Sequence, residues 1–268
     1  MFDGHKAGCA FVGMVHLLPL PGSHSWGGSM RSVLDRAMAD AQLLLEGGCD
    51  AIIVENMGDA PYLPREVAPE TLAAITLATA RVVELGAPVG LQILAAANRQ
   101  ALGVAAVAGA SFIRVEGFAY AHVADEGYID ACAGELLRAR RHLGAEVAIW
   151  ADVQKKHASH ALTADLSIED LSLGAGFCGA DALVVTGAHT GKAANFSDID
   201  GAARAGLPIA IGSGVTSQNA AEMAQRAQAL IVGSWLKREG LWKNPVSLDR
   251  VKDIRDAIGA RAEKECSP

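Results

Sequence analysis

The stretch Pro208-Ile-Ala-Ile-Gly-Ser-Gly-Val-Thr216 joins a short apolar run to a glycine-rich turn. An antiparallel strand with one face in water would alternate apolar and polar residues, whereas residues 208–211 are apolar throughout. A continuous run of this kind is typical of a parallel strand that is covered on both faces. The sequence therefore predicts a buried parallel strand that ends in a tight turn.

The same pattern recurs along the chain, and most of the apolar runs precede a segment with helical periodicity. Val33, Ala37, Ala41 and Leu44 are spaced by three and four residues, which predicts a helix that ends at Gly47. The predicted strands cover residues 9–15, 51–54, 89–93, 112–115, 147–150, 182–185, 208–211 and 230–232, and further helices are predicted over residues 69–83 and 248–260.

Eight parallel strands that alternate with helices close most naturally into a barrel. The chain has 268 residues, and a (β/α)8 barrel needs about 250. An open doubly wound sheet is the alternative, but it would require a glycine-rich turn after the first strand, and residues 16–22 read His-Leu-Leu-Pro-Leu-Pro-Gly. We therefore predict one α/β domain over residues 1–268, a (β/α)8 TIM barrel of the phosphate-binding type.

Composition excludes several classes of protein. The chain is 51% hydrophobic and 20% charged, as expected for a compact globule. The basic residues are scattered and the net charge is −7, so a nucleic-acid partner is not expected. The longest apolar stretch, residues 101–113, is too short to cross about 30 Å of hydrocarbon, which predicts no membrane-spanning segment. A disulfide framework or zinc knuckle is not expected and a reducing cytoplasm fits best, since no Cys-x-x-Cys pair occurs among Cys9, Cys49, Cys132, Cys178 and Cys266.

The turns after the last two strands are candidates for anion binding. Active sites of (β/α)8 barrels lie at the carboxyl ends of the strands, and phosphate is commonly held after the seventh and eighth. Glycines in these turns let backbone N–H groups approach an anion closely. The alternative is that the glycines only permit sharp turns. The predicted phosphate cup consists of Gly212, Ser213, Gly214, Gly233 and Ser234.

Four side chains at strand ends are candidates for acid–base catalysis. Asp152 and His157 follow the fifth strand, where a carboxylate can tune an imidazole, although a solvated loop capped by Asp152 is the alternative. His16 follows the first strand as an acid, a base, a ligand or a structural residue. Glu55 ends an apolar run, so it either pairs with Arg114 or a lysine or acts on substrate. A divalent metal between these side chains lacks the spacing of a metal motif, and no cofactor is predicted.

Other polar residues at the same rim are candidate ligand contacts. Arg114 and Glu116 point to one side of their strand and form an internal ion pair or take part in catalysis. Lys155 or Lys156 could form a Schiff base if desolvated, although neither follows its strand closely. The candidate substrate or phosphate contacts at these strand ends are Asn56, Arg114, Thr186 and Thr190.

Several segments spread over nearly the whole chain point to one family. They are Gly13-Met-Val-His-Leu-Leu-Pro-Leu-Pro-Gly22, Val54-Glu-Asn56, Ala151-Asp152 with Lys156-His157, Thr186-Gly-Ala-His-Thr-Gly191, Gly212-Ser-Gly-Val-Thr216 with Asn219, and Val232-Gly-Ser-Trp-Leu-Lys237 followed by Asn244-Pro245. Together these segments resemble the BtpA/SgcQ family, and the decapeptide after the first strand is the most specific of them. The segment after the third strand departs from the family, because it keeps only Asn98 and Arg99 of an Asn-x-Leu-Arg-Asn-type cluster.

The resemblance implies a (β/α)8 fold like that of the ribulose-phosphate-binding barrels, and it adds Gly187 and Gly191 to the ligand contacts. It also implies two kinds of role. One branch of the family is linked to photosystem I accumulation and peripheral membrane association, and another belongs to sugar-utilisation gene clusters. No settled reaction attaches to the family.

Three functions remain open from the sequence. The first is an enzyme that acts on a small phosphorylated sugar or nucleoside-like metabolite, as an isomerase, epimerase, lyase or hydrolase. The second is a non-catalytic assembly factor that uses the barrel as a scaffold. The third is a ligand sensor that keeps the phosphate cup without the chemistry. A homo-oligomer is expected only from the habit of such barrels.

Overall fold

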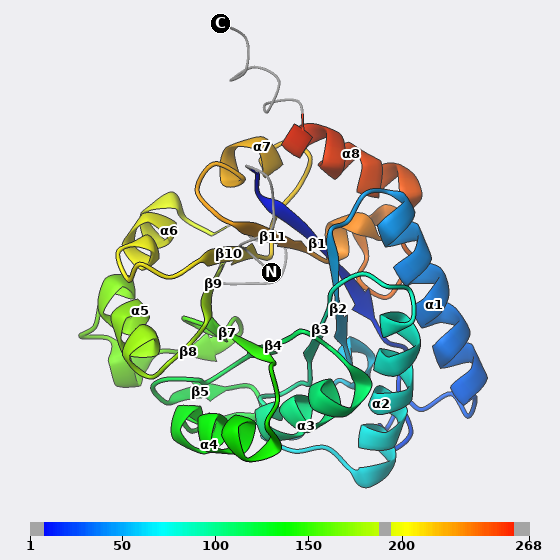
Figure 1. Cartoon of the computed structure of the whole chain (residues 1–268), viewed down its shortest axis with the longest axis horizontal. Coiled ribbons are helices and arrows are strands. Elements are labelled where there is room, and N and C mark those ends of the chain that lie inside the picture. Colours follow the sequence, from blue (N-terminus) through cyan, green and yellow to red (C-terminus); the bar gives the residue numbers. More distant parts are fainter. Residues whose placement is uncertain (1–7, 188–193, 260–268) are drawn as a thin grey trace, which may run out of the picture.

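Parallel strands form a closed barrel surrounded by helices in this computed structural model, which describes residues 8–187 and 194–259 (Figure 1). Around the barrel the strands follow the order β1-β11-β10-β9-β7-β4-β3-β2. Their bounds are β1 (Ala10–His16), β2 (Ala51–Glu55), β3 (Val89–Gln92), β4 (Phe112–Val115), β7 (Ala148–Asp152), β9 (Ala182–Thr186), β10 (Ile209–Gly212) and β11 (Ala229–Val232). All eight predicted strands are thus barrel strands, and the predicted (β/α)8 fold is confirmed.

Helices follow the barrel strands and cover the outside of the barrel (Figure 1). They are α1 (Met30–Glu46), α2 (Pro69–Val83), α3 (Asn98–Ala108), α4 (Ala133–Leu143), α5 (Ile168–Phe177), α6 (Phe196–Ala203), α7 (Ala220–Met223) and α8 (Leu248–Gly259). The first begins at the Ser29 N-cap, whose side chain accepts from the backbone N–H of Ser32, and it ends at the expected Gly47. No helix in the described ranges is long and apolar enough to cross a membrane.

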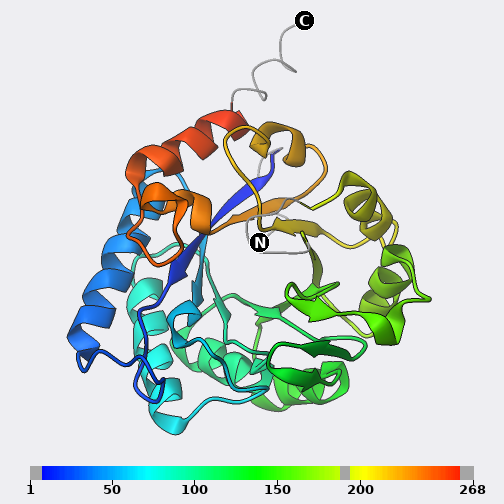
Figure 2. The ribbon, with the colours of Figure 1, turned by 180° about the vertical axis from the view of Figure 1, so that it is seen from behind.

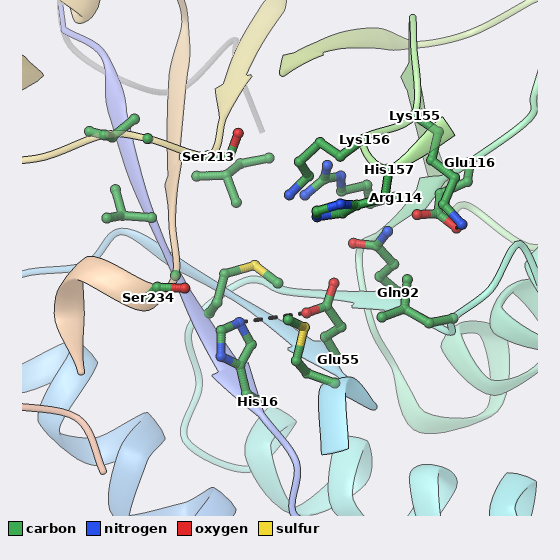
Figure 3. A pocket seen from close by; sticks show the side chains of 18 of the residues that line it. His16, Glu55, Gln92, Arg114, Glu116, Lys155, Lys156, His157, Ser213 and Ser234 are labelled. Atoms are coloured by element: carbon green, nitrogen blue, oxygen red, sulfur yellow. Dashed lines mark ion pairs between the residues drawn. The ribbon is translucent and has the colours of Figure 1, made fainter. Parts of the chain in front are cut away.

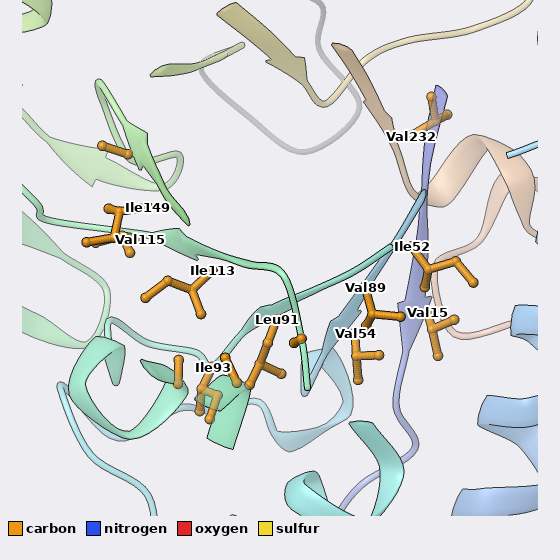
Figure 4. Packing of buried hydrophobic residues seen from close by; sticks show 14 of the residues in the cluster. Val15, Ile52, Val54, Val89, Leu91, Ile93, Ile113, Val115, Ile149 and Val232 are labelled. Carbon is orange, nitrogen blue, oxygen red and sulfur yellow. The ribbon is translucent and has the colours of Figure 1, made fainter. Parts of the chain in front are cut away.

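Strand residues alternate between the inside of the barrel and the layer beneath the helices. On the inner face, the rings of Phe112 and Trp150 stack with centroids 4.1 Å apart and fill the barrel interior. Gly90 makes room for them, because a Cβ at that position would lie 2.3 Å from the Phe112 ring. On the outer face, residues such as Val54 and Ile113 pack in a second apolar layer (Figure 4).

The alternation also places polar residues at the barrel mouth. Ala10, Val12 and Met14 face inward along β1, so His16 is the next inward position at its carboxyl end. His16 pairs in register with Glu55, and Glu55 pairs with Gln92 on the next strand. The apolar interior therefore ends in a ring of polar side chains.

A small antiparallel sheet beside the barrel was not predicted from the sequence. It consists of β5 (His122–Ala124), β6 (Gly127–Ile129) and β8 (Ala158–Ser159), in the order β6-β5-β8 (Figure 2). Residues Asp125 and Glu126 lie in the turn between β5 and β6 and line the pocket at the barrel mouth. The sheet therefore adds acidic groups that do not follow any barrel strand.

Candidate functional site

A pocket of about 240 Å³ opens among the carboxyl ends of the barrel strands (Figure 3). Its size suits a small metabolite, since pockets for drug-sized ligands span roughly 300–1,000 Å³. Among its polar lining residues are His16, Glu55, Gln92, Arg114, Glu116, Lys155, Lys156, His157, Ser213 and Ser234. The predicted rim thus brings together side chains from β1, β2, β3 and β4 and from the turns after β7, β10 and β11.

His16 and Glu55 lie next to each other in the pocket wall. His16 Nδ1 lies 3.2 Å from the backbone oxygen of Trp242, which can only accept, so Nδ1 carries the proton and Nε2 is left as an acceptor. His16 Nε2 lies 3.5 Å from Glu55 Oε2. Burial, helped by the charge of Lys237, lowers the pKa of His16 to about 3, and burial raises the pKa of Glu55. A neutral imidazole therefore faces a carboxyl group that holds its proton more tightly than usual.

Arg114 and Asp152 form a buried ion pair at the inner side of the site. Arg114 Nη2 lies 3.0 Å and Nε 3.1 Å from Asp152 Oδ1. Burial alone would lower the pKa of Arg114, but the charges of Asp152 and Glu55 raise it above its ordinary value. Glu55 therefore contacts the His16 ring, and its charge also helps to raise the pKa of Arg114. Asp152 holds the guanidinium and does not line the pocket itself.

Glu116 lies in the pocket wall with incomplete charge compensation. Its Oε2 accepts from the backbone N–H of Ala96 at 3.1 Å, and Lys155 Nζ lies 3.8 Å away. Lys155 is closer to Glu126, at 2.5 Å. Burial raises the pKa of Glu116 to about 7, against the opposing charge of Lys155. A carboxyl group with a pKa near neutrality can both donate and accept a proton at physiological pH.

The variant Glu116→Gln is expected to remove part of the pH dependence of stability. The folded-state pKa of Glu116 lies above its ordinary value of 4.5, so the folded chain binds more protons than the unfolded chain between pH 4.5 and 7. The stability that Glu116 contributes is therefore full below pH 4.5 and is lost as the pH rises through 7. Relative to the variant, we expect the parent to lose on the order of 3 kcal/mol over this window, measured by urea unfolding at each pH.

The exposed Glu146→Gln is the matched control for this prediction, because it makes the same chemical change outside the pocket. Parallel stability curves for the parent and Glu116→Gln from pH 4.5 to pH 7.5 would contradict the prediction.

The tight turns after β10 and β11 lie at the pocket, where the sequence predicts the phosphate cup. Ser213 and Gly214 are both left-handed, with φ of 70° and 68°, and the Ser213 hydroxyl accepts from the backbone N–H of Gly187 at 3.3 Å. Asn219 holds the turn by donating to the Gly214 carbonyl. At Gly233, a Cβ would lie 3.2 Å from the His16 ring, so glycine lets the second turn approach His16 closely.

Several predicted contacts lie away from the pocket lining. Asn56 accepts from Leu94 N–H at 2.8 Å and donates to Asp59, so it ties the end of β2 to the segment after β3. Thr186 donates to the Gln154 carbonyl. A Cβ at Gly212 would lie 3.6 Å from Arg114 Nη1, which shows that this glycine leaves space for the guanidinium. Thr190 and Gly191 fall outside the described residues.

Asp152 and His157 are five residues apart, yet the structure places them differently. Asp152 is buried and forms an ion pair with Arg114, whereas His157 is exposed at the rim with a φ of 55°. Within residues 8–187 and 194–259, no group of three or more His, Cys, Asp and Glu side chains is arranged to hold a metal ion.

Sequence reasoning missed several pocket residues, among them Tyr62 and Glu126, and gave no special role to Gln92. Tyr62, in the segment between β2 and α2, donates to the Met57 carbonyl and lines the pocket. Glu126 reaches the site through the small sheet. Gln92 ranked only as one more strand-end residue, but its buried Oε1 has no hydrogen-bond partner in the described part of the chain. The sequence could have indicated this role, because Gln92 ends β3 at the position that pairs in register with the inward-facing Glu55.

Comparisons with known proteins agree with this geometry. The model of the BtpA family matches residues 8–260. The chain is 43% identical to an uncharacterized mitochondrial protein of Caenorhabditis elegans, over 89% of each protein. It is 40% identical to the photosystem I biogenesis protein BtpA of Synechocystis, over 92% of this chain and 87% of that one.

Solved structures share the fold at low sequence identity. Phosphoribosyl anthranilate isomerase of Thermus thermophilus superposes with a TM-score of 0.56 at 15% identity, covering 94% of this chain and 99% of the other. A 3-hexulose-6-phosphate synthase superposes with a TM-score of 0.58 at 16% identity, covering 93% and 99%. The fold likeness, the full-length family match and the identity to BtpA together show that this chain belongs to the BtpA family.

Proposed function

We propose that this protein is an enzyme that acts on a small phosphorylated sugar or nucleoside-like metabolite by acid–base chemistry. The observation that carries the proposal is one small pocket lined both by the glycine turns after β10 and β11 and by acid–base side chains such as His16, Glu55 and Glu116 (Figure 3). Proton transfer between carbon and such groups needs no cofactor. Isomerase, epimerase, lyase and hydrolase activities all fit this arrangement.

The phosphate would rest on the turns after β10 and β11. Successive backbone N–H groups in a tight turn can converge on an anion, and Ser213 and Gly214 form such a turn at the pocket. Ser234 and Gly233 line the same side of the pocket. The phosphate-free end of the ligand would then lie over the barrel axis, where the orphaned Gln92 oxygen can accept a hydrogen bond from a hydroxyl group.

Proton transfer would be carried by His16, Glu55 and Glu116. Glu116, with a pKa of about 7, is suited to abstract and return a proton. A protonated Glu55 can donate a hydrogen bond to a developing negative charge without adding a fixed charge of its own, while His16 Nε2 accepts from a neighbouring hydroxyl group. Two solved neighbours support the assignment through their names, the phosphoribosyl anthranilate isomerase and the 3-hexulose-6-phosphate synthase.

The test is thermal unfolding with triose, pentose and hexose phosphates and nucleoside monophosphates, each compared with its unphosphorylated form and with inorganic phosphate. A ligand at 100 times its Kd should raise Tm by roughly 5–10 °C. Gly233→Ala should abolish the shift, because its Cβ crowds His16. Gly103→Ala on α3, where the nearest atom lies 4.0 Å away, is the control. No shift with any phosphorylated compound would overturn the proposal.

A non-catalytic assembly factor is the second candidate, and the 40% identity to a photosystem I biogenesis protein favours it. In that role the barrel would be a scaffold, with peripheral membrane association and self-association through its outer surface. Complementation of a strain that lacks the relative distinguishes the two candidates. Loss of rescue by Glu55→Gln supports the enzyme, whereas full rescue by that variant and loss after outer-surface changes supports the scaffold.

The cysteines bear on where the protein works. Cys9, Cys49, Cys132 and Cys178 are free thiols, which supports a reducing compartment such as the cytoplasm as part of this proposal.

A further inference from the structure

We propose that Lys156 Nζ is a nucleophilic amine that forms an imine with the carbonyl carbon of a phosphorylated aldehyde or ketone. This inference rests on the proposed function, because the phosphate cradle must place the carbonyl group in the pocket. It narrows the substrate class to metabolites that carry a free carbonyl group.

The first observation is that Lys156 differs from the other lysines near the barrel mouth in its ion pairing. Lys155 lies 2.5 Å from Glu126, and the buried Lys237 lies 3.2 Å from Asp40. Lys156 lines the pocket and makes no ion pair with any residue that the structure describes. An amine held by a carboxylate stays an ammonium ion, whereas an unpaired, partly buried amine is free to react.

The second observation is the charge around the amine. Figure 3 shows Lys156 beside Arg114 at the side of the pocket that faces Glu55 and His16. Burial and then the positive charge of Arg114 lower the pKa of Lys156, against the charges of Glu55 and other carboxyl groups. Each unit by which the pKa falls raises the fraction of free amine at neutral pH about tenfold. Arg114 keeps its positive charge, because its Nη2 lies 3.0 Å from Asp152 Oδ1.

The pocket also holds the groups that the imine step requires. The lone pair of the free amine attacks the carbonyl carbon, the C=O π electrons move to oxygen, and a proton transfers from nitrogen to that oxygen to give a carbinolamine. A protonated carboxyl group, Glu116 or Glu55, then gives a proton to the hydroxyl group, which leaves as water while the nitrogen lone pair forms the C=N⁺ bond. The carboxylate formed in this step is the base that removes a proton from the adjacent carbon. Hydrolysis by the reverse path restores the amine.

An iminium ion would complete the chemistry of this site. It accepts the electron pair of a neighbouring C–H or C–C bond as that bond breaks, so it serves proton abstraction and aldol-type cleavage equally. The neutral His16 and the carboxyl group of Glu55 can take part in hydrogen bonds but supply no fixed positive charge. Lys156 would supply that charge at the reacting carbon itself.

Reductive trapping tests the proposal directly. The full-length protein is incubated at pH 7 with glyceraldehyde 3-phosphate and cyanoborohydride, and the products are mapped by intact-protein and peptide mass spectrometry. We expect one adduct per chain at Lys156, formed at least about tenfold faster than adducts at exposed lysines such as Lys252. Inorganic phosphate should slow the reaction by competing for the cradle.

Adjacent lysines provide matched variants. Lys156→Met and Lys156→Arg should both lose the fast adduct, and the arginine variant keeps the charge if the methionine variant is unstable. Lys155→Arg should retain the fast adduct. Labelling that follows exposure alone, or that persists in both Lys156 variants, would overturn the proposal.

The unphosphorylated probe separates this proposal from the proposed function. If glyceraldehyde labels Lys156 as fast as its phosphate does, the amine is nucleophilic and the phosphate cradle is wrong. If phosphorylated sugars raise Tm but no adduct forms at Lys156, the proposed function stands and the imine is wrong.

Discussion

Asp40→Ala is expected to lower the free energy of unfolding by about 3–5 kcal/mol, because it leaves a buried ammonium group without its counter-charge. Lys237 Nζ is fully buried, 3.2 Å from Asp40 Oδ2 and 2.9 Å from the Met14 carbonyl. Asp40 Oδ1 also accepts from the backbone N–H of Val246 at 2.8 Å. The variant therefore leaves the Lys237 ammonium group without its carboxylate and the backbone N–H of Val246 without its acceptor. Urea unfolding at pH 7 measures the loss.

Asp35→Ala on the same helix is the control, since Asp35 is 73% exposed and its partner Arg31 lies 3.7 Å away. Exposed pairs contribute less than about 1 kcal/mol. The double variant Asp40→Ala with Lys237→Met should regain part of the loss, because it removes both charges. If Asp35→Ala and Asp40→Ala lower the free energy of unfolding equally, the buried pair does not stabilise the protein more than an exposed pair, and the prediction is wrong.

The loss should also depend on pH. Burial lowers the pKa of Lys237, and Asp40 raises it. Without Asp40 the folded-state pKa falls further below the unfolded value, so the folded chain binds fewer protons and its stability rises with pH. The deficit of Asp40→Ala should therefore shrink between pH 7 and pH 10. Because Lys237 holds the β1 backbone two residues before His16, the pair also positions His16 in the pocket wall.

Arg114→Met is expected to cost a similar 3–5 kcal/mol at pH 8, because two buried carboxyl groups lose their shared cation. Asp152 accepts from Arg114 Nε at 3.1 Å, and the charge of Arg114 opposes the rise that burial causes in the pKa of both Asp152 and Glu55. Without it, both groups bind protons more tightly in the folded chain. Stability then falls as the pH rises above their unfolded values, so the deficit should be smallest near pH 5 and larger at pH 8.

The double variant Arg114→Met with Asp152→Asn should recover about 1–3 kcal/mol at pH 8, measured by the same urea unfolding. Arg204→Met is the control, because Arg204 is 69% exposed in its pair with Glu169. No recovery in the double variant, or a deficit that does not change from pH 5 to pH 8, would contradict the expected role of the pair.

The barrel could be predicted because each strand can be recognised from a short stretch of sequence. Most strands are uninterrupted apolar runs, as burial on both faces requires, and their ends are marked by a polar residue or a glycine. Residues 147–150 show the limit of this reasoning, since β7 continues to Asp152. The small β5–β6–β8 sheet was missed because strands of two or three residues have no periodicity, and Val123 pairs with Ser159 from a distant part of the chain.

The sequence could predict where the candidate site residues lie, but it could not predict which residues they contact. Position at a strand end placed His16, Glu55 and Arg114 among the candidates, and all three line one pocket. The same reasoning gave no way to distinguish Asn56, which bonds to the Leu94 backbone, from a pocket residue. From the sequence, Lys237 had no role beyond its place in a family segment, because its partner Asp40 lies 197 residues earlier.

Local chemistry alone, read from the sequence, thus determined the fold, the end of the barrel that carries the polar rim and the residue types at that rim. Tertiary structure decided which charges are compensated: Asp152 on Arg114, Lys155 on Glu126, Lys237 on Asp40, with Lys156 outside any such pair in the described chain. The physical reason is that side-chain charges act over a few ångströms in a medium of low polarity. Their pairing, and hence their protonation, depends on distances that only chain closure sets.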